Sequence, residues 1–219
     1  MGLLLDANQL PIGMKLYPGN RSEKSVIRET INELKSQNGI SGKIIQIADK
    51  GLNCAINIYE ARLNGDGYLF SKSCLQLKEK EKTWVLLDND YVDVTDSSGK
   101  VKYRIKECVD DFKYSFKDDE GKEIKFTVKE KRAATYNAFL AEKKKLEITK
   151  IINKANELCL SQAKKDEYGE CAKYVEFVDE DDNKAKIKIN EKKIEEDLKI
   201  AGYNLLVTSE IKANKNRYL

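Results

Sequence analysis

In the first 74 residues, short apolar runs typical of strands alternate with segments whose apolar residues are spaced as in a helix. Residues 3–5 are an apolar run, residues 6–9 are a turn-forming cluster and residues 11–16 resume as an extended segment, which predicts a β-hairpin. Ser22 can then cap a helix that stops near Asn38. The apolar residues of this helix follow helical spacing: Val26, Ile27, Ile31 and Leu34.

A β-branched run at residues 43–48 predicts a buried parallel strand, with Asp49 at its carboxyl end. A second helix is expected at about 53–63, and another short strand at 68–70. The order hairpin, helix, strand, helix, strand indicates the α/β class, with a mixed sheet covered by helices.

Beyond Cys74 the pattern changes to short segments separated by turn residues. Residues 84–87, 101–105 and 124–128 have strand-like composition, which indicates antiparallel meanders. A long lysine-rich helix with a broken apolar stripe is expected from about residue 131 to residue 163. The remaining expected elements are strands at 174–178, 185–189 and 203–208 and a short helix at 191–198.

Composition narrows the possible chemistry. Hydrophobic residues make up 41% of the 219 residues, which is enough to build a core. The 40 basic and 37 acidic side chains nearly cancel, so net charge says little about partners. The sequence has no histidine, and its five cysteines lack metal-finger spacing. Imidazole bases and mixed zinc sites are therefore excluded, which leaves carboxylates, lysines or a bound metal.

No apolar run approaches the roughly 20 residues that span a bilayer. The first residues also lack the basic-then-apolar pattern of a signal peptide. We therefore expect a cytoplasmic protein with no membrane partner.

Asp49 has the most informative position in the chain. Ligands of open α/β sheets collect beyond the carboxyl ends of strands, and Gly51 allows a tight turn close to a ligand. Mg²⁺ takes a few carboxylate oxygens and completes its shell with water or substrate phosphate, so a strand-end aspartate suits it. An aspartate after a strand is, however, more often a cap for the next helix, here through Asp49 itself or Asn53.

Several short motifs occur together in a fixed order. They are Leu3-Leu4-Leu5-Asp6, Leu10-Pro11-Ile12-Gly13, Tyr17-Pro18-Gly19-Asn20 followed by Glu23, Ile47-Ala48-Asp49-Lys50-Gly51-Leu52-Asn53, and Leu206-Val207-Thr208-Ser209-Glu210. As a set they resemble bacterial insertion-sequence transposases of the DDE type, whose catalytic domain has a ribonuclease H-like fold. The resemblance covers most of the chain and is strongest in residues 1–74 and around 203–210.

The resemblance implies an incomplete ribonuclease H-like mixed sheet with helices, plus an inserted β-rich and helical subdomain. Residues 1–74 would form the partial core, residues 75–200 the insertion, and residues 201–219 the return strand and a truncated end. Strand one of that fold lies between strand two and strand four and would precede the hairpin of this chain. Without strand one, the hairpin and the strand before Asp49 would each have an edge with unpaired backbone N–H and C=O groups.

The resemblance also implies an activity. The second catalytic aspartate of such enzymes lies in a similar Asp-Lys/Arg-Gly element, which makes Asp49 the expected catalytic residue and metal ligand. The family mechanism is two-metal phosphoryl transfer with Mg²⁺ or Mn²⁺. The implied partners are DNA, as transposon ends and as target, and further copies of the enzyme.

The first aspartate and the glutamate of the family have no counterpart here. Glu210 belongs to the Thr-Ser-Glu motif and is not assigned to the glutamate's role. We therefore expect a transposase fragment, truncated at both ends and inactive alone. The alternative is a non-catalytic DNA-binding or assembly module in which Asp49 is vestigial.

Other residues are weaker candidates for DNA contact. Lys50 and Lys72 flank the sheet edge at which the strand before Asp49 is expected to end. They are therefore the lysines that we most expect to contact DNA. Trp84 could stack on an unpaired base, although a core position is the commoner role for a single tryptophan. Residues 143–145 are lysines with interleaved glutamates nearby, which is typical of a solvated helix face.

Overall fold

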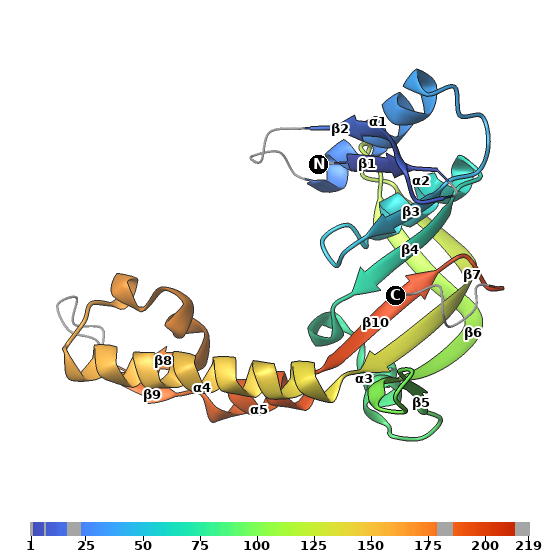
Figure 1. The fold of residues 1–219 in the computed structure, drawn as a ribbon. Coiled ribbons are helices and arrows are strands. Elements are labelled where there is room, and N and C mark those ends of the chain that lie inside the picture. Colours follow the sequence, from blue (N-terminus) through green and yellow to red (C-terminus); the bar gives the residue numbers. More distant parts are fainter. Residues whose placement is uncertain (1, 7, 17–22, 179–185, 213–219) are drawn as a thin grey trace. The chain divides into compact units, whose positions relative to one another are not determined.

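The protein is described here by a computed structural model that covers residues 2–6, 8–16, 23–178 and 186–212. Its α-helices are α1 Glu23–Gln37, α2 Ala55–Leu63, α3 Glu79–Leu86, α4 Ala138–Leu160 and α5 Glu191–Lys199, with 3₁₀ helices η1 Cys74–Gln76 and η2 Lys165–Tyr174. Its strands are β1 Gly2–Leu5, β2 Pro11–Lys15, β3 Ile45–Ala48, β4 Gly67–Lys72, β5 Val92–Thr95, β6 Val101–Lys117, β7 Glu123–Tyr136, β8 Val175–Phe177, β9 Ile187–Ile189 and β10 Tyr203–Thr208 (Figure 1).

The strands form a mixed sheet of six and two separate two-stranded sheets. The six-stranded sheet has the order β3-β4-β10-β7-β6-β5, and the pairs β1-β2 and β8-β9 stand apart from it. Strand β3 runs parallel to β4, while β10 is antiparallel to β4 and β5 is antiparallel to β6. The α/β class is thus confirmed, as are the hairpin and the parallel pairing of the strand that precedes Asp49.

The chain divides into two compact units. The first contains residues 1–73, 107–133 and 205–219, and the second contains residues 74–106 and 134–204. Residues 107–133, which lie inside the range expected for the insertion, are thus grouped with the first residues of the chain.

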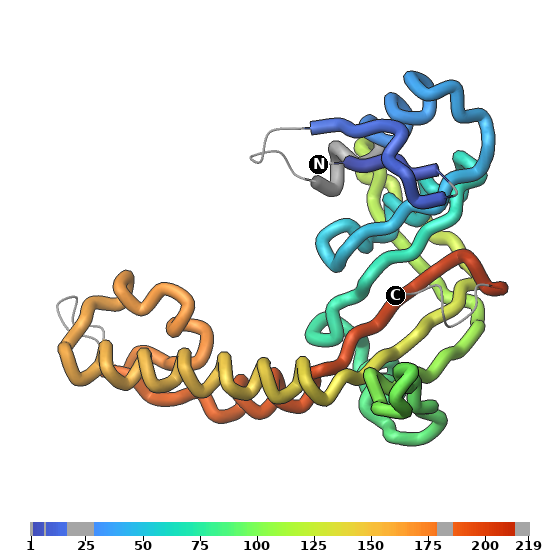
Figure 2. The backbone as a smooth tube through the Cα atoms, viewed as in Figure 1, coloured from blue at the N-terminus to red at the C-terminus, as the bar shows by residue number. Residues whose placement is uncertain are grey.

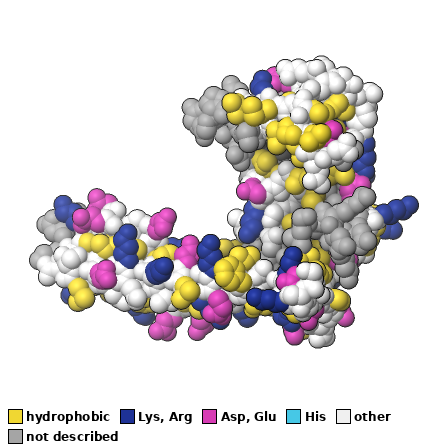
Figure 3. Space-filling model, viewed as in Figure 1, with side chains coloured by type: hydrophobic (Ala, Val, Ile, Leu, Met, Phe, Trp, Pro, Cys, Tyr) yellow, Lys and Arg dark blue, Asp and Glu magenta, His cyan; other side chains and the backbone are white. Residues whose placement is uncertain are grey.

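The hairpin of the first unit is covered by α1 on one face. A Cβ atom at Gly2 would come within 2.6 Å of Thr30 Cγ2, and one at Gly13 within 2.8 Å of Asn38 Nδ2, so the helix packs closely on the hairpin at both glycines. The other face carries exposed apolar side chains: Leu3, Leu5, Ile12 and Met14. Figure 3 shows hydrophobic side chains gathered over β1 and β2. The hairpin therefore has one packed face and one apolar face open to solvent.

The same turn closes three hairpins of the chain. Asp6, Asp96 and Asp118 each accept hydrogen bonds from two backbone N–H groups, two and four residues further on. The residue three positions after each aspartate has a positive φ, and it is Gly99 or Gly121 in two turns and Gln9 in the third. Aspartate favours such turns because its carboxylate bonds to the backbone ahead of it.

Two predicted elements are wrong in type or extent. The predicted strand at residues 84–87 is instead the end of a helix, because 84–86 close α3 and Leu87 caps it. The long helix predicted from residue 131 starts later, since residues 131–136 continue β7 and α4 begins only at Ala138. Asn137 caps α4, because its side-chain oxygen accepts a hydrogen bond from Leu140 N at 3.1 Å.

Strand β3 is not buried as expected. It is the edge strand of the six-stranded sheet. Ile45 and Ile47 are 51% and 74% exposed, whereas Gln46 between them is 8% exposed. Its apolar face therefore has no covering layer among the described residues, although parallel strands are usually covered on both faces.

The second unit has a core of its own around α4. Buried residues of α4, η2 and β8 pack together, and β9 adds partly buried isoleucines. Figure 2 shows α5 running beside α4, and the two helices are in contact. The predicted cap Ser22 and the motif Tyr17-Pro18-Gly19-Asn20 lie outside the described residues.

Candidate functional site

Asp49 follows β3 directly at the carboxyl end of the strand. The side chain is exposed, and its Oδ1 accepts a hydrogen bond from Gly51 N at 2.9 Å. The Asp49 carbonyl accepts a second, longer bond from Leu52 N at 3.3 Å. The carboxylate thus shapes a turn, and it remains open to solvent.

The two lysines expected near this position lie at the same edge of the sheet. Ala48 is opposite Phe70 in the parallel register, so Lys72 ends β4 at the edge where Asp49 follows β3. Asn53 Nδ2 donates a hydrogen bond to Ser71 O at 3.1 Å, which ties the loop after β3 to β4. Lys50 is exposed, whereas Lys72 is half-buried. The structure thus brings Asp49, Lys50 and Lys72 to one rim.

Trp84 belongs to the second unit and has a structural partner there. It is half-buried in α3, and Lys106 Nζ lies 5.0 Å from the centroid of its ring. Lys106 also lies over the Tyr91 ring and donates to the carbonyl of Leu87. A buried lysine between two aromatic rings is held by cation–π attraction. Packing with Lys106 therefore gives Trp84 a structural role in the second unit, and its base-stacking role stays a prediction.

Glu210 is placed away from Asp49. Its Oε1 accepts a hydrogen bond from Lys43 Nζ at 2.6 Å, and Lys43 precedes β3, whereas Asp49 follows it. Six extended residues span about 20 Å. Glu210 and Asp49 therefore lie toward opposite ends of the strand, and the two carboxylates do not share a metal ion.

The rim offers few metal ligands. Among the described residues, no group of three or more His, Cys, Asp or Glu side chains is arranged to hold a metal ion. Asp49 is a single carboxylate, and Mg²⁺ bound through one carboxylate depends on water and phosphate for its other ligands. The described residues thus do not form a two-metal site by themselves.

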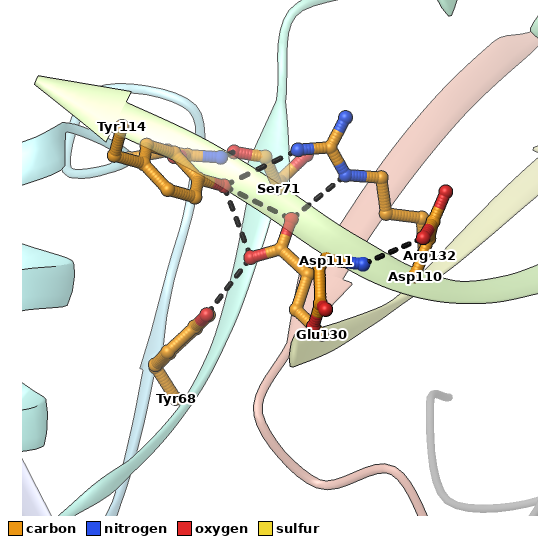
Figure 4. Close-up of polar contacts among 8 residues, drawn as sticks. Tyr68, Ser71, Asp110, Asp111, Tyr114, Glu130 and Arg132 are labelled. Carbon is orange, nitrogen blue, oxygen red and sulfur yellow. Dashed lines mark hydrogen bonds and ion pairs between the residues drawn. The ribbon is translucent and has the colours of Figure 1, made fainter. Parts of the chain in front are cut away.

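A buried ionic cluster, which sequence reasoning missed, lies in the first unit (Figure 4). Glu130 is 0% exposed and accepts hydrogen bonds from the Tyr68 hydroxyl at 2.8 Å and the Tyr114 hydroxyl at 2.9 Å. Arg132 Nε donates to Glu130 at 2.7 Å, and the guanidinium carbon lies 3.3 Å from the centroid of the Phe112 ring. The cluster joins β4, β6 and β7.

One signal in the sequence could have revealed this cluster. Every second residue of β7 from Ile124 to Val128 faces the interior. Glu130 and Arg132 are the next two residues in this alternation. A charged pair two residues apart at inward positions of a strand indicates a buried ion pair.

The cluster is suited to structure rather than proton transfer. Burial, followed by the negative charge of Glu130, raises the pKa of Tyr68 well above its usual value. The same two causes raise the pKa of Tyr114, and Arg132 partly opposes them. Both tyrosines therefore stay protonated at neutral pH and act as hydrogen-bond donors to the carboxylate.

A second buried carboxylate fastens α1 to the sheet. Asp66 Oδ1 accepts hydrogen bonds from Lys35 Nζ at 2.8 Å and from Ile44 N at 3.2 Å. Asp66 is 5% exposed and lies in the loop before β4, and Ile44 directly precedes β3. This contact also serves the fold.

The second unit contains a hollow of about 340 Å³ between α4 and η2. Its lining residues are Lys144, Glu147, Ile151, Gly169, Glu170, Lys173 and Tyr174. Lys144 pairs with Glu147 at 2.7 Å, and Lys173 pairs with Asp197, so the lysines of the hollow are already neutralised. The lining residues therefore offer no free positive charge to select an anionic ligand.

No helix among the described residues is long and apolar enough to cross a membrane. Comparison of the chain with protein-family models, curated proteins and solved structures gives no match.

Proposed function

We propose that this chain is part of the catalytic domain of a DDE-type transposase, with Asp49 as one of the carboxylates that hold a divalent metal ion. The observation that carries the proposal is the position of Asp49: an exposed carboxylate at the carboxyl end of a strand that runs parallel to its neighbour. Ligands of α/β sheets collect at such strand ends. The intact enzyme would cut and join DNA.

The sheet arrangement supports the proposal. A ribonuclease H-like sheet has one further strand between the hairpin and the strand that carries this aspartate. Here β3 is the edge strand of its sheet, and β1 and β2 form a separate sheet in the same unit. A strand paired to the open edge of β3 would restore the expected order.

The chain should be inactive alone. Two-metal phosphoryl transfer needs several carboxylates around the reacting phosphate, and the described residues offer Asp49 without two such companions. Strand transfer catalysed by the isolated chain, supplied with Mg²⁺ or Mn²⁺ and transposon-end DNA, would overturn this expectation.

Metal binding at Asp49 can be tested with paramagnetic Mn²⁺ and the ¹⁵N-labelled chain. In the presence of short duplex DNA, Mn²⁺ should broaden the amide signals of Lys50 and Gly51. This broadening should disappear in Asp49→Asn, which keeps the oxygen that accepts from Gly51 N but removes the charge. Broadening that persists in Asp49→Asn, or that never appears, would refute the role of Asp49.

Asp118→Asn is a matched control. Asp118 also accepts a backbone hydrogen bond from the residue two positions further on, Glu120, at 3.1 Å. The variant therefore makes the same chemical change in a similar turn. It should leave the broadening near Gly51 unchanged.

A non-catalytic assembly module is the second candidate, and the hairpin favours it. Leu3, Leu5, Ile12 and Met14 are between 44% and 58% exposed on one face. A continuous apolar face of this kind marks an interaction site. This candidate predicts that Met14→Glu reduces self-association in sedimentation experiments, while Asp49→Asn changes neither DNA binding nor metal binding.

A further inference from the structure

The solvent face of α4 carries an unusual line of apolar residues. Phe139, Leu146 and Leu160 are 75%, 63% and 85% exposed, and Asn153 completes a spacing of seven residues from 139 to 160. These positions lie opposite the buried face of the helix, whose buried residues are Ala141, Ile148 and Ala155. Single exposed apolar residues are common, but three of them along one side of a helix form a line that a second helix can cover.

The line is long and straight enough for a helical partner. The 23 residues of α4 extend for about 35 Å. Positions seven apart drift by only about 20° per step around a straight helix, so all four residues can contact one neighbouring helix. Figure 3 shows hydrophobic side chains interspersed with charged ones along α4.

We infer that this face is a weak dimer interface, in which α4 packs antiparallel against α4 of a second copy of the chain. Under a twofold axis Phe139 lies opposite Leu160 of the second copy, and Leu146 lies opposite Asn153. Each copy thus contributes the same residues, as an isologous interface requires.

Charge complementarity favours a second copy of the chain in this antiparallel orientation. One of the two rows of residues that flank the apolar line is Lys143, Lys150 and Glu157. In an antiparallel pair, Lys143 of each copy faces Glu157 of the other copy, which gives two pairs of opposite charge. In this row the one like-charged pair is formed by the two copies of Lys150. Opposite helix dipoles also favour the antiparallel arrangement.

The interface should be weak. Three apolar side chains per copy form a small contact, and Asn153 and Lys150 both reduce its stability. The dimer is therefore expected at high protein concentration and should dissociate on dilution. The inference concerns α4 alone, so its failure would leave the proposal for Asp49 untouched.

Sedimentation velocity of the full chain over a range of concentrations tests the inference. The average mass should rise from monomer toward dimer, and Leu146→Glu should weaken this association by roughly tenfold or more. Leu63→Glu is the control, because Leu63 ends α2 with nearly the same exposure, 64%, and lies in the other unit. A wild-type chain that stays monomeric, or equal effects of the two variants, would overturn the inference.

Three further variants test the interface and its orientation. Asn153→Leu should tighten the dimer, because it replaces the polar residue of the line. Lys143→Glu should weaken it by placing a second carboxylate against Glu157 of the other copy, and the added change Glu157→Lys should restore it. Failure of this rescue would refute the antiparallel pairing. Dissociation by Met14→Glu but not by Leu146→Glu would assign the interface to the hairpin instead.

Discussion

Asp49 and Glu130 are both acidic residues of the first unit, but their surroundings differ in every respect. Asp49 is exposed and accepts one side-chain hydrogen bond, from a backbone N–H group. Glu130 is fully buried and accepts hydrogen bonds from two tyrosines and an arginine. An open carboxylate keeps oxygens available for an external ligand, whereas a saturated one stabilises the fold. The comparison therefore separates the residue that can take part in chemistry from the one that holds the sheet together.

The largest effect is expected from Glu130→Ala. The substitution removes the Glu130 carboxylate to which Arg132, 6% exposed, donates, and with it the acceptor of both tyrosine hydroxyls. Loss of one member of a buried ion pair costs about 3–5 kcal/mol. The free energy of unfolding, measured by urea denaturation, should fall by this amount. A decrease below about 1 kcal/mol would show that the cluster does not hold the sheet.

Alkaline pH should weaken the same cluster. The pKa values of Tyr68 and Tyr114 are raised above the ordinary 10.0, so the unfolded chain loses these protons at a lower pH than the folded chain. Their contribution to stability is thus complete below about pH 10 and is lost as the pH rises from there toward the folded pKa values. Each raised tyrosine removes about 1.4 kcal/mol per pH unit in that range. Urea denaturation at increasing pH measures the slope.

Tyr114→Phe should have a smaller effect at neutral pH. It removes the hydrogen bond to Glu130 at 2.9 Å but keeps the ring that stacks on Phe126 at 5.5 Å. A hydrogen bond to a charged group contributes about 1.5–3 kcal/mol, and the two remaining donors of Glu130 place the expected loss near the lower figure. The variant should also show a shallower loss of stability above pH 10. An unchanged slope would mean that Tyr114 is not among the tyrosines that resist ionisation.

The sequence predicted the strands and helices wherever the apolar period was clear. It failed at residues 84–87, because four consecutive apolar residues fit a helix turn and a strand equally well. It failed at residues 131–136 because Glu130 and Arg132 replace apolar residues at inward positions and so hide the alternation of β7. In both places the arrangement of neighbouring strands, which local pattern does not encode, decides the structure.

The candidate site was predictable in part for the same reason. Asp49, Lys50 and Lys72 reach one rim because β3 and β4 are parallel neighbours, and this pairing follows from the strand-helix-strand order. The exposure of Ile45 and Ile47 was not predictable, since an apolar run does not reveal whether a covering layer is present. The ionic cluster was missed because its four polar residues come from three strands that are distant in sequence.

The smallest effect on stability is expected from Asp49→Asn, which tests the other side of the comparison. Asparagine keeps the side-chain oxygen that accepts from Gly51 N, and the position is exposed, so the free energy of unfolding should change by less than about 0.5 kcal/mol. Urea denaturation of this variant beside Glu130→Ala measures both carboxylates on one scale. A loss above about 1 kcal/mol would mean that the charge of Asp49 stabilises the turn. The carboxylate would then have a structural reason to be there, and its position at the strand end would no longer favour a metal ligand.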